Sequence, residues 1–309
     1  MTSSYHPGEL AVRLRAGVPN PAVKVPGFTI PPVAAEMLRA QPLAVAGVRD
    51  AEGRMWAFAL TGKPGFIQVL DESTVIIQSK LPDDTMESGL KTNSHLGLVV
   101  VDFGLRRRMR LNGSAKVQAD GTLLIQAQEV YSNCPQYIQE RHWKMAPASE
   151  QALYSQQTNN QLSAKQVGWI ESADTFFIAS SGPEGRADAS HRGGNPGFVR
   201  VLDERLLVWP DYAGNKLFQT LGNIYLNPNV GLLFLDFNQG DLLQLTGTAK
   251  TIWESERLKE FPGAERLVEF EIAQIRETKN AHPLRWEFIS YSSRNPPLNS
   301  QFTQPKDTS

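Results

Sequence analysis

The chain has 309 residues, with 31 lysines and arginines against 32 aspartates and glutamates, which gives a formal net charge of −1. This balance argues against nucleic acid or an anionic membrane surface as a partner, because both attract proteins with a basic excess. The single cysteine, Cys134, excludes an intrachain disulfide and a cysteine-based zinc cluster, and no metal site is predicted.

The N-terminal residues lack the basic and apolar stretches of a secretory signal. The longest apolar runs contain about six residues, whereas a membrane span needs about twenty. We therefore expect a soluble, cytoplasmic protein with no membrane partner, in which residues 1–30 form an N-terminal arm.

Beyond this arm the sequence contains two related halves. Residues 52–72 and 184–204 are identical at 12 of 21 positions, and residues 93–116 and 227–250 at 9 of 24 positions. The offsets between these segments are 132 and 134 residues, so the two pairs are collinear. Because this period is far too long for a solenoid, it indicates two copies of a whole domain.

Each copy is expected to be a small barrel, because short β-branched and aromatic runs alternate with turn residues around one helix. The copies should occupy residues 31–145 and 169–290, joined by a polar, glutamine-rich helical linker at 146–168. Residues 291–309 are polar and contain prolines, which predicts a flexible tail. In the second copy we predict strands at 175–180, 198–202, 206–209, 230–237 and 242–252, and a helix at 214–226.

The copies differ in ways that indicate one binding site between them. The second copy has Ser190-His191-Arg192-Gly193-Gly194 where the first has Phe58-Ala59-Leu60-Thr61-Gly62. Its helix follows Asp211 and begins at Gly214-Asn215-Lys216. Backbone N–H groups, the helix dipole and two cations suit a phosphate. The alternative is that the glycines only make a turn and that Arg192 is solvated.

The first copy has a basic run of its own. Arg106, Arg108 and Arg110 would share one face of a strand, where they either reach a ligand or form a solvated edge. In the regions that mirror these two sets of cations the sequence has Asp83-Asp84 and Gly240-Asp241, which predicts that a mirror-related site has lost its function.

A polar and aromatic segment, Cys134 to Trp143, ends the first copy. Cys134 is either a nucleophile or a small packed side chain, and the second reading is favoured because no histidine or aspartate partner is evident. Tyr137, Arg141 and Trp143 would either clamp a planar ring or pack against the barrel.

In combination, these motifs resemble the pyridoxamine 5'-phosphate oxidase-like family of FMN-binding split barrels. The segments that carry the resemblance are SHRGGNPGFVRVLDERLL, PDYAGNKLFQTLGNIYLNPNVGLLFLDF and NCPQYIQERHW. The resemblance implies a mainly β fold, a β-barrel fold with flanking helices, in which two tandem six-stranded Greek-key split barrels form a pseudo-dimer. It also implies that FMN lies in the groove between the barrels.

The elements that hold the FMN phosphate in this family match the second copy, and those that approach the flavin ring match the first. The resemblance therefore implies one FMN per chain. The residues that it assigns to FMN are Ser190, Arg192, Gly193, Arg200, Asp211, Gly214, Asn215 and Lys216 from the second copy, and Arg108, Arg110, Cys134, Tyr137, Arg141 and Trp143 from the first.

The function implied by the resemblance is an FMN-dependent oxidoreductase that acts on a small anionic or aromatic molecule, as a monomer or homodimer. No side chain is assigned as catalytic. The arginine–histidine pattern that binds substrate in pyridoxamine phosphate oxidases is absent, so vitamin B6 oxidation is not expected. The alternatives are a non-enzymatic flavin- or haem-binding protein on the same fold, and a barrel that has lost its cofactor and serves as an interaction module.

Overall fold

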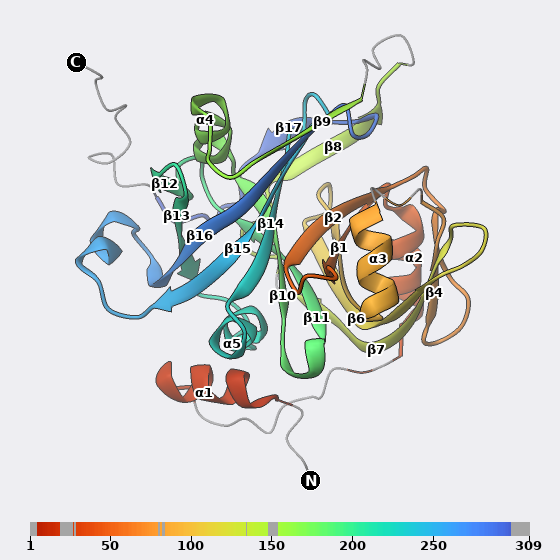
Figure 1. Cartoon of the computed structure of the whole chain (residues 1–309), viewed down its shortest axis with the longest axis horizontal. Coiled ribbons are helices and arrows are strands. Elements are labelled where there is room, and N and C mark those ends of the chain that lie inside the picture. The colour runs from red at the N-terminus through yellow and green to blue at the C-terminus, as the bar shows by residue number, and fades with distance from the viewer. Residues whose placement is uncertain are drawn as a thin grey trace.

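The chain folds mostly into strands, which form two strongly curved sheets standing side by side (Figure 1). The computed structural model describes residues 5–18, 27, 29–79, 81, 84–133, 135–147 and 154–297. The predicted mainly β fold with flanking helices is confirmed. None of the described helices combines the length and the apolar character that crossing a membrane requires.

The first sheet has the strand order β2-β1-β5-β6-β7-β4-β3. Its two end strands, β2 and β3, do not pair with each other, so the barrel is split along that side. Helix α2 precedes the sheet, and α3 connects β4 to β5. The bounds are α2 (Pro32–Ala40), β1 (Leu43–Arg49), β2 (Met55–Thr61), β3 (Ile67–Val69), β4 (Thr74–Ile77), α3 (Asp84–Thr92), β5 (His95–Asp102), β6 (Arg107–Val117) and β7 (Leu123–Asn133).

The second sheet repeats this order strand by strand, as β11-β10-β14-β15-β16-β13-β12, with β9 added to β16. Six strands were expected in each barrel, and the seventh is the short outer strand of a hairpin, β3 or β12. The bounds are β9 (Ser155–Asn159), α4 (Ala164–Ser172), β10 (Thr175–Ser181), β11 (Ala187–Gly193), β12 (Arg200–Asp203), β13 (Leu206–Tyr212), α5 (Gln219–Leu226), β14 (Asn229–Leu235), β15 (Leu242–Ile252) and β16 (Ala264–Lys279), with short 3-10 turns at Pro183–Gly185 and Glu256–Glu260.

Strand β1 is buried along nearly its whole length because its two faces contact two different cores. Successive side chains of a strand point to opposite faces. Ala44 and Ala46 therefore contribute to the core of the first barrel, whereas Leu43 and Val45 pack in a core shared with Phe177 of the second barrel. This shared core fixes how the barrels face each other and so positions the cavity between them.

Two glycines that match in the sequence repeat allow the barrels to approach closely. A Cβ atom at Gly97 would collide with the backbone of Asp188 in the other barrel, and one at Gly231 would lie 2.6 Å from the backbone oxygen of Met55. Each position is on the strand next to the central one, β5 or β14. Glycine is therefore required here by close packing between backbones.

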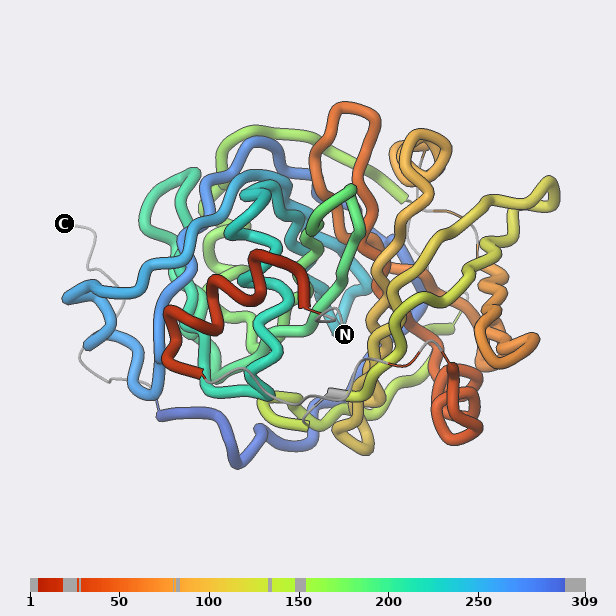
Figure 2. The backbone as a smooth tube through the Cα atoms, turned by 90° about the horizontal axis from the view of Figure 1, so that it is seen from below, coloured from red at the N-terminus to blue at the C-terminus, as the bar shows by residue number. Residues whose placement is uncertain are grey.

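A third, two-stranded sheet joins the ends of both halves. It consists of β8 (Glu140–Met145) and β17 (Leu284–Ser290), with Trp143 directly opposite Trp286. Helix α1 (Pro7–Arg15) lies against α5, across the second barrel (Figure 2). The predicted N-terminal arm therefore contains a packed helix.

The prediction of a helical linker is wrong for part of its length. Residues 148–153 lie outside the described residues, and 155–159 form strand β9, antiparallel to β16. Strand β16 has sixteen residues, and β9 satisfies backbone groups that would otherwise form an open edge. Helix α4 begins only at Ala164, after Ser163 caps it.

The predicted tail is fixed over its first residues. The backbone N–H of Ser292 donates to Gln139 Oε1 at 2.8 Å, and Asn295 Nδ2 donates to the same atom at 3.0 Å. Gln139 is completely buried, which explains why this polar segment is held. Residues from 298 onwards lie outside the described residues, so the prediction of flexibility is untested for them.

Candidate functional site

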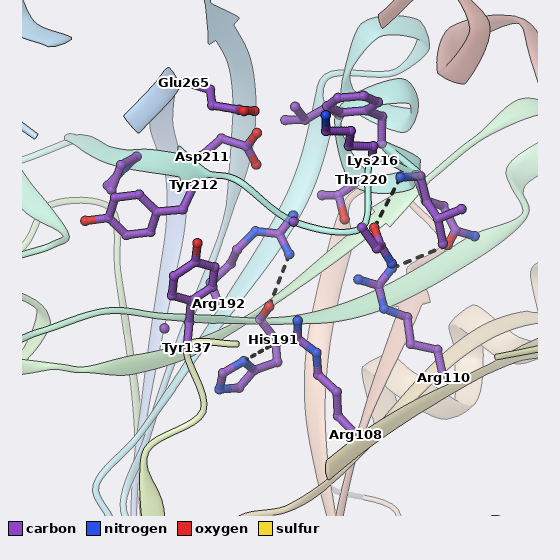
Figure 3. A pocket seen from close by; sticks show the side chains of 18 of the residues that line it. Arg108, Arg110, Tyr137, His191, Arg192, Asp211, Tyr212, Lys216, Thr220 and Glu265 are labelled. Atoms are coloured by element: carbon purple, nitrogen blue, oxygen red, sulfur yellow. Dashed lines mark hydrogen bonds between the residues drawn. The ribbon is translucent and has the colours of Figure 1, made fainter. Parts of the chain in front are cut away.

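A cavity between the barrels brings together nine of the fourteen predicted site residues (Figure 3). Strand β6 of the first sheet forms one wall, and β11, β13 and the start of α5 form the other, so both walls come from one chain. The lining residues are Arg108, Arg110, Tyr137, His191, Arg192, Gly193, Phe198, Pro210, Asp211, Tyr212, Gly214–Leu221 and Glu265.

The loop before α5 forms the polar end of this cavity. The predicted helix at 214–226 starts only at Gln219, because Lys216 and Phe218 have φ angles of 57° and 58°. Phe218 precedes the first turn and offers no side-chain acceptor to its N–H groups. Thr220 Oγ1 is buried and has no hydrogen-bond partner among the described residues. A helix start of this kind attracts an anion through its dipole and its N–H groups.

Two arginines, one from each barrel, meet at Ser190. Arg192 Nη1 donates to Ser190 Oγ at 2.7 Å and to the backbone oxygen of His191 at 3.1 Å. Arg110 Nη2 also donates to Ser190 Oγ. Ser190 is completely buried and does not line the cavity itself. It therefore fixes the two guanidinium groups from behind.

Arg110 has a buried counter-ion in the other barrel. Its Nη1 lies 3.2 Å from Asp188 Oδ2, and Asp188 Oδ1 also accepts from Asn112 Nδ2 at 3.2 Å and from the Tyr131 hydroxyl at 3.3 Å. Burial and then Asp188 raise the pKa of Tyr131 well above its usual value, so the phenol stays a donor. Asp188 thus offsets the charge of Arg110 and holds its orientation across the junction of the barrels.

His191 lies next to Arg108 at the other end of the cavity. Arg108 Nη1 is 2.9 Å from His191 Nδ1. Burial, followed by the surrounding arginines, lowers the pKa of His191 well below its usual value, so the imidazole is neutral. Because a guanidinium group can only donate, Nδ1 must accept and the ring proton must be on Nε2.

Asp211 faces the cations from β13. The pKa of Asp211 is raised above its usual value, because burial outweighs the opposing effect of Arg192 and Arg266. Arg266 Nη1 lies 3.5 Å from Asp211 Oδ2, and its guanidinium group stacks over the rings of Phe218 and Trp253. Arg266 itself is buried and also pairs with Glu265. Asp211 therefore connects the anion-facing arginine to the support beneath the loop.

The charges that line the cavity do not cancel. The cations are Arg108, Arg110, Arg192 and Lys216, and the acids are Asp211 and Glu265. With His191 neutral, the lining has a formal surplus of two positive charges. Such a surplus favours an anionic ligand carrying about two negative charges, as a phosphate monoester does.

Tyr137 closes one side of the cavity. Its hydroxyl donates to the backbone oxygen of Ala213 at 2.8 Å, and its ring lies 5.3 Å from that of Tyr212. Burial and the neighbouring Tyr137 raise the pKa of Tyr212 to about 12. The pair presents aromatic surface beside the polar end.

Besides Ser190, the structure places three predicted residues outside this cavity: Arg200, Arg141 and Trp143. Arg200 pairs with Glu260 at 2.9 Å and lies over the ring of Phe261. Arg141 pairs with Asp174 at 2.5 Å and lies over the ring of Phe237. Each guanidinium group is instead held by a carboxylate and an aromatic ring.

Trp143 lines a separate cavity together with Arg141 and Trp286, at the two-stranded sheet. Cys134 lies outside the described residues. Arg106 precedes β6, with a φ of 50°, and donates to Ser290 Oγ at 2.6 Å. Only Arg108 and Arg110 of the predicted basic face therefore reach the site.

Several residues that line the cavity were not predicted from the sequence. Gln219 and Thr220 directly follow the Gly-Asn-Lys motif, so continuing that motif into the helix would have found them. His191 lies within the Ser-His-Arg motif, but no binding role was predicted for it. Glu265 and the supporting Arg266 carry no motif, because the long strand β16 brings them in from the far end of the second barrel.

A second cavity occupies the mirror-related position. Leu242 and Gln244 stand where β6 has Arg108 and Arg110, and Thr61 and Ser79 stand where the other barrel has Gly193 and Asp211. Its lining consists of Ala59, Thr61, Ser79, Leu81, Tyr154, Gln156, Leu242, Gln244, Thr278, Ala281 and His282. Burial and Arg285 lower the pKa of His282 to about 4, so the described residues of this lining carry no charge at neutral pH.

The predicted cause of this difference needs correction. Asp84 begins α3 and does not line the mirror cavity, and Asp83 lies outside the described residues. Gly240 and Asp241 lie between β14 and β15, where Asp241 Oδ1 accepts the N–H of Asn280 at 2.7 Å. Among the described residues, the arginines are missing because Leu242 and Gln244 occupy the strand positions that face this cavity.

Comparison with known proteins finds a family match over the second barrel. Residues 162–286 match the profile of the family described as pyridoxamine 5'-phosphate oxidase. Among solved structures, the chain is similar to a putative pyridoxamine 5'-phosphate oxidase from Lactobacillus delbrueckii, with 20% identity over 38% of this chain and 94% of that chain, and a TM-score of 0.32.

Two further solved structures are described by the flavin they bind. An FMN-binding protein from Syntrophomonas wolfei has 10% identity over 37% of this chain and 84% of that chain, with a TM-score of 0.29. An FAD binding protein from Mycobacterium smegmatis has 17% identity over 40% of this chain and 98% of that chain, with a TM-score of 0.27. No curated protein matches this chain.

Proposed function

We propose that this chain, whose second barrel belongs to the pyridoxamine 5'-phosphate oxidase-like family, binds one FMN between its barrels and works as an FMN-dependent oxidoreductase on a small molecule. The observation that carries the proposal is the cavity itself, in which a cationic helix start on one barrel faces an arginine wall from the other. The two barrels, at 31–145 and 169–290, would then contribute the ring-facing and phosphate-binding halves.

The phosphate end of FMN fits the second barrel. Arg192 and Lys216 would supply positive charge, the first N–H groups of α5 would donate to the phosphate oxygens, and Thr220 would gain the partner that its buried hydroxyl lacks. A phosphate monoester has three terminal oxygens, so it can use several of these donors at once. This favours FMN over a flavin without phosphate.

The ring end of the flavin fits the residues around His191. When bound, FMN supplies hydride and electron transfer. Arg108 holds a fixed positive charge that would stabilise negative charge on a ring or substrate nearby. Neutral His191 has its proton on Nε2, so it can donate one hydrogen bond but cannot act as a cation. Tyr137 would contribute aromatic contact.

The haem-binding alternative is less well supported by the same geometry. Haem iron requires an axial ligand. Among the described lining residues the one histidine is His191, whose Nδ1 faces Arg108 and whose Nε2 is buried. A flavin needs no such ligand, and the positive lining favours its phosphate.

Titration of the purified protein, stripped of any bound flavin, with FMN, FAD and riboflavin tests the proposal. We expect FMN to bind at least about tenfold more tightly than riboflavin, because charged hydrogen bonds to its phosphate contribute about 1.5–3 kcal/mol each. Flavin fluorescence reports the binding, and anaerobic reduction of the bound flavin by candidate electron donors reports redox activity. Equal affinity for FMN and riboflavin would contradict the phosphate assignment, and absence of flavin binding would overturn the proposed function.

A further inference from the structure

Helix α1, near the N-terminus, packs directly on the helix whose start faces the cavity (Figure 2). Gly8 of α1 and Gly222 of α5 are in backbone contact, so that a Cβ atom at Gly222 would lie 2.6 Å from the backbone nitrogen of Glu9. Val12 is buried in the core of the second barrel. The helix is therefore seated on α5 by packing that does not depend on the loop before α5.

One side chain of α1 reaches that loop. Arg13 Nη1 donates to the backbone oxygen of Lys216 at 2.5 Å, and Arg13 is buried, with its guanidinium group over the ring of Tyr5. Lys216 is one of the residues that line the anion end of the cavity. A hydrogen bond to the carbonyl fixes the peptide that follows Lys216, and hence the direction from which the loop enters α5.

The loop needs such support because its backbone is strained. Lys216 and Phe218 have φ angles of 57° and 58°, in the left-handed region that residues other than glycine rarely adopt. Residues in such conformations persist only where their surroundings hold them. Arg266 holds Phe218 from below by stacking on its ring. Arg13, from helix α1, holds Lys216 through the hydrogen bond to its backbone oxygen.

We propose that Arg13 is a positioning residue for phosphate recognition, through which α1 keeps the loop at 214–218 in its ligand-binding shape. This inference rests on the proposed binding of FMN and adds an element to it. Because Arg13 acts on the loop and not on the arginines near His191, its loss should weaken recognition of the phosphate and leave recognition of the ring nearly unchanged.

The affinities of Arg13→Leu for FMN and for riboflavin test this inference. We expect FMN affinity to fall by about tenfold, as for loss of a charged hydrogen bond, while riboflavin affinity changes less than twofold. Arg15→Leu is the matched control, because Arg15 is exposed on the same helix and stacks on Trp253 instead. It should change neither affinity by more than about twofold.

Arg13→Lys keeps a charge and a donor in the same place. It covers the case in which the leucine variant does not fold, and its FMN affinity should fall between those of the wild type and Arg13→Leu. Equal loss of FMN and riboflavin affinity, or no loss of either, would overturn the role of Arg13. Neither result would contradict the proposal that the wild-type protein binds FMN. A wild-type protein that does not prefer FMN to riboflavin would instead refute the proposed function.

Discussion

The two mirror-related cavities of this chain are built from equivalent strands but differ in charge. The mirror cavity is the larger, at about 330 Å³ against about 110 Å³, so lack of space does not explain why it should be inactive. Among the residues that the structure describes, one lining has four cations and two acids, whereas the other has no side chain that is charged at neutral pH. A few strand residues are thus enough to give two copies of one fold cavities of different charge.

The support beneath the walls differs in the same way. In the proposed flavin cavity, Asp188, Ser190 and Asp211 hold the arginines in place. At the position equivalent to Asp188 the first barrel has Trp56, and at that of Arg192 it has Leu60, both completely buried. Where one barrel buries an ionic network, the other buries apolar side chains.

The largest effect is expected from breaking the ion pair between the barrels. Asp188→Ala leaves Arg110 buried without its counter-ion, which should reduce the free energy of unfolding by about 3–5 kcal/mol. Chemical denaturation measures this. The control is Lys91→Ala, which removes the exposed pair of Lys91 with Glu87 and should cost less than about 1 kcal/mol. Similar small losses in both variants would show that the buried network does not hold the charged cavity together.

A pH-dependent effect should follow from α1, which packs on α5 of the second barrel. Burial raises the pKa of Glu9 from 4.5 to about 7. The N–H of His6 and Arg186 oppose this shift, and Glu129 and Asp188 add to it. Between these two pH values the unfolded chain has lost the proton that the folded chain keeps. Stability should therefore fall as pH rises through this window, by up to about 3 kcal/mol, and be constant above it.

Glu9→Gln removes this titration and keeps the side-chain shape. Its free energy of unfolding, measured between pH 4.5 and 7, should decline less steeply than that of the wild type by the contribution of one proton. Parallel pH profiles for the two proteins would show that Glu9 is ionised in the folded state and that α1 carries no such dependence.

A smaller effect, on binding alone, is expected from making the flavin cavity resemble its mirror. Arg192→Leu introduces the residue that the first barrel has at this position, and FMN affinity should fall by about 1.5–3 kcal/mol. Ser79→Ala, in the mirror cavity at the position equivalent to Asp211, should leave FMN affinity unchanged. A comparable loss in both variants would mean that the two cavities share the ligand.

Local sequence patterns predicted much of the fold, because alternation and turn residues determine where strands run. The predicted strand at 242–252 coincides with β15, and Glu184-Gly185 makes the turn between β10 and β11. Strand β11 was not predicted, because its residues are small or polar where they face the other barrel. The start of α5 was misplaced because left-handed backbone at Lys216 and Phe218 has no sequence signature.

Site residues could be predicted where they belong to one local motif. They could not be predicted where a partner distant in the sequence determines the position of the side chain. Arg192 and Lys216 lie in the cavity as expected. Arg141 and Arg200 belong to equally suggestive segments, but Asp174 and Glu260 bind them, and no spacing in the sequence indicates those contacts. The roles of Asp188 and Arg266 depend in the same way on strands that only the folded structure brings together.

The number of FMN molecules bound per chain is the most direct test of whether the charged cavity alone binds FMN. Titration of the flavin-free protein, followed by flavin fluorescence and checked by the phosphorus and protein content of the saturated complex, gives this number. We expect one FMN per chain in the wild type and in Ser79→Ala, with binding weakened in Arg192→Leu. Two FMN molecules per chain, or one whose affinity Arg192→Leu leaves unchanged, would contradict this expectation.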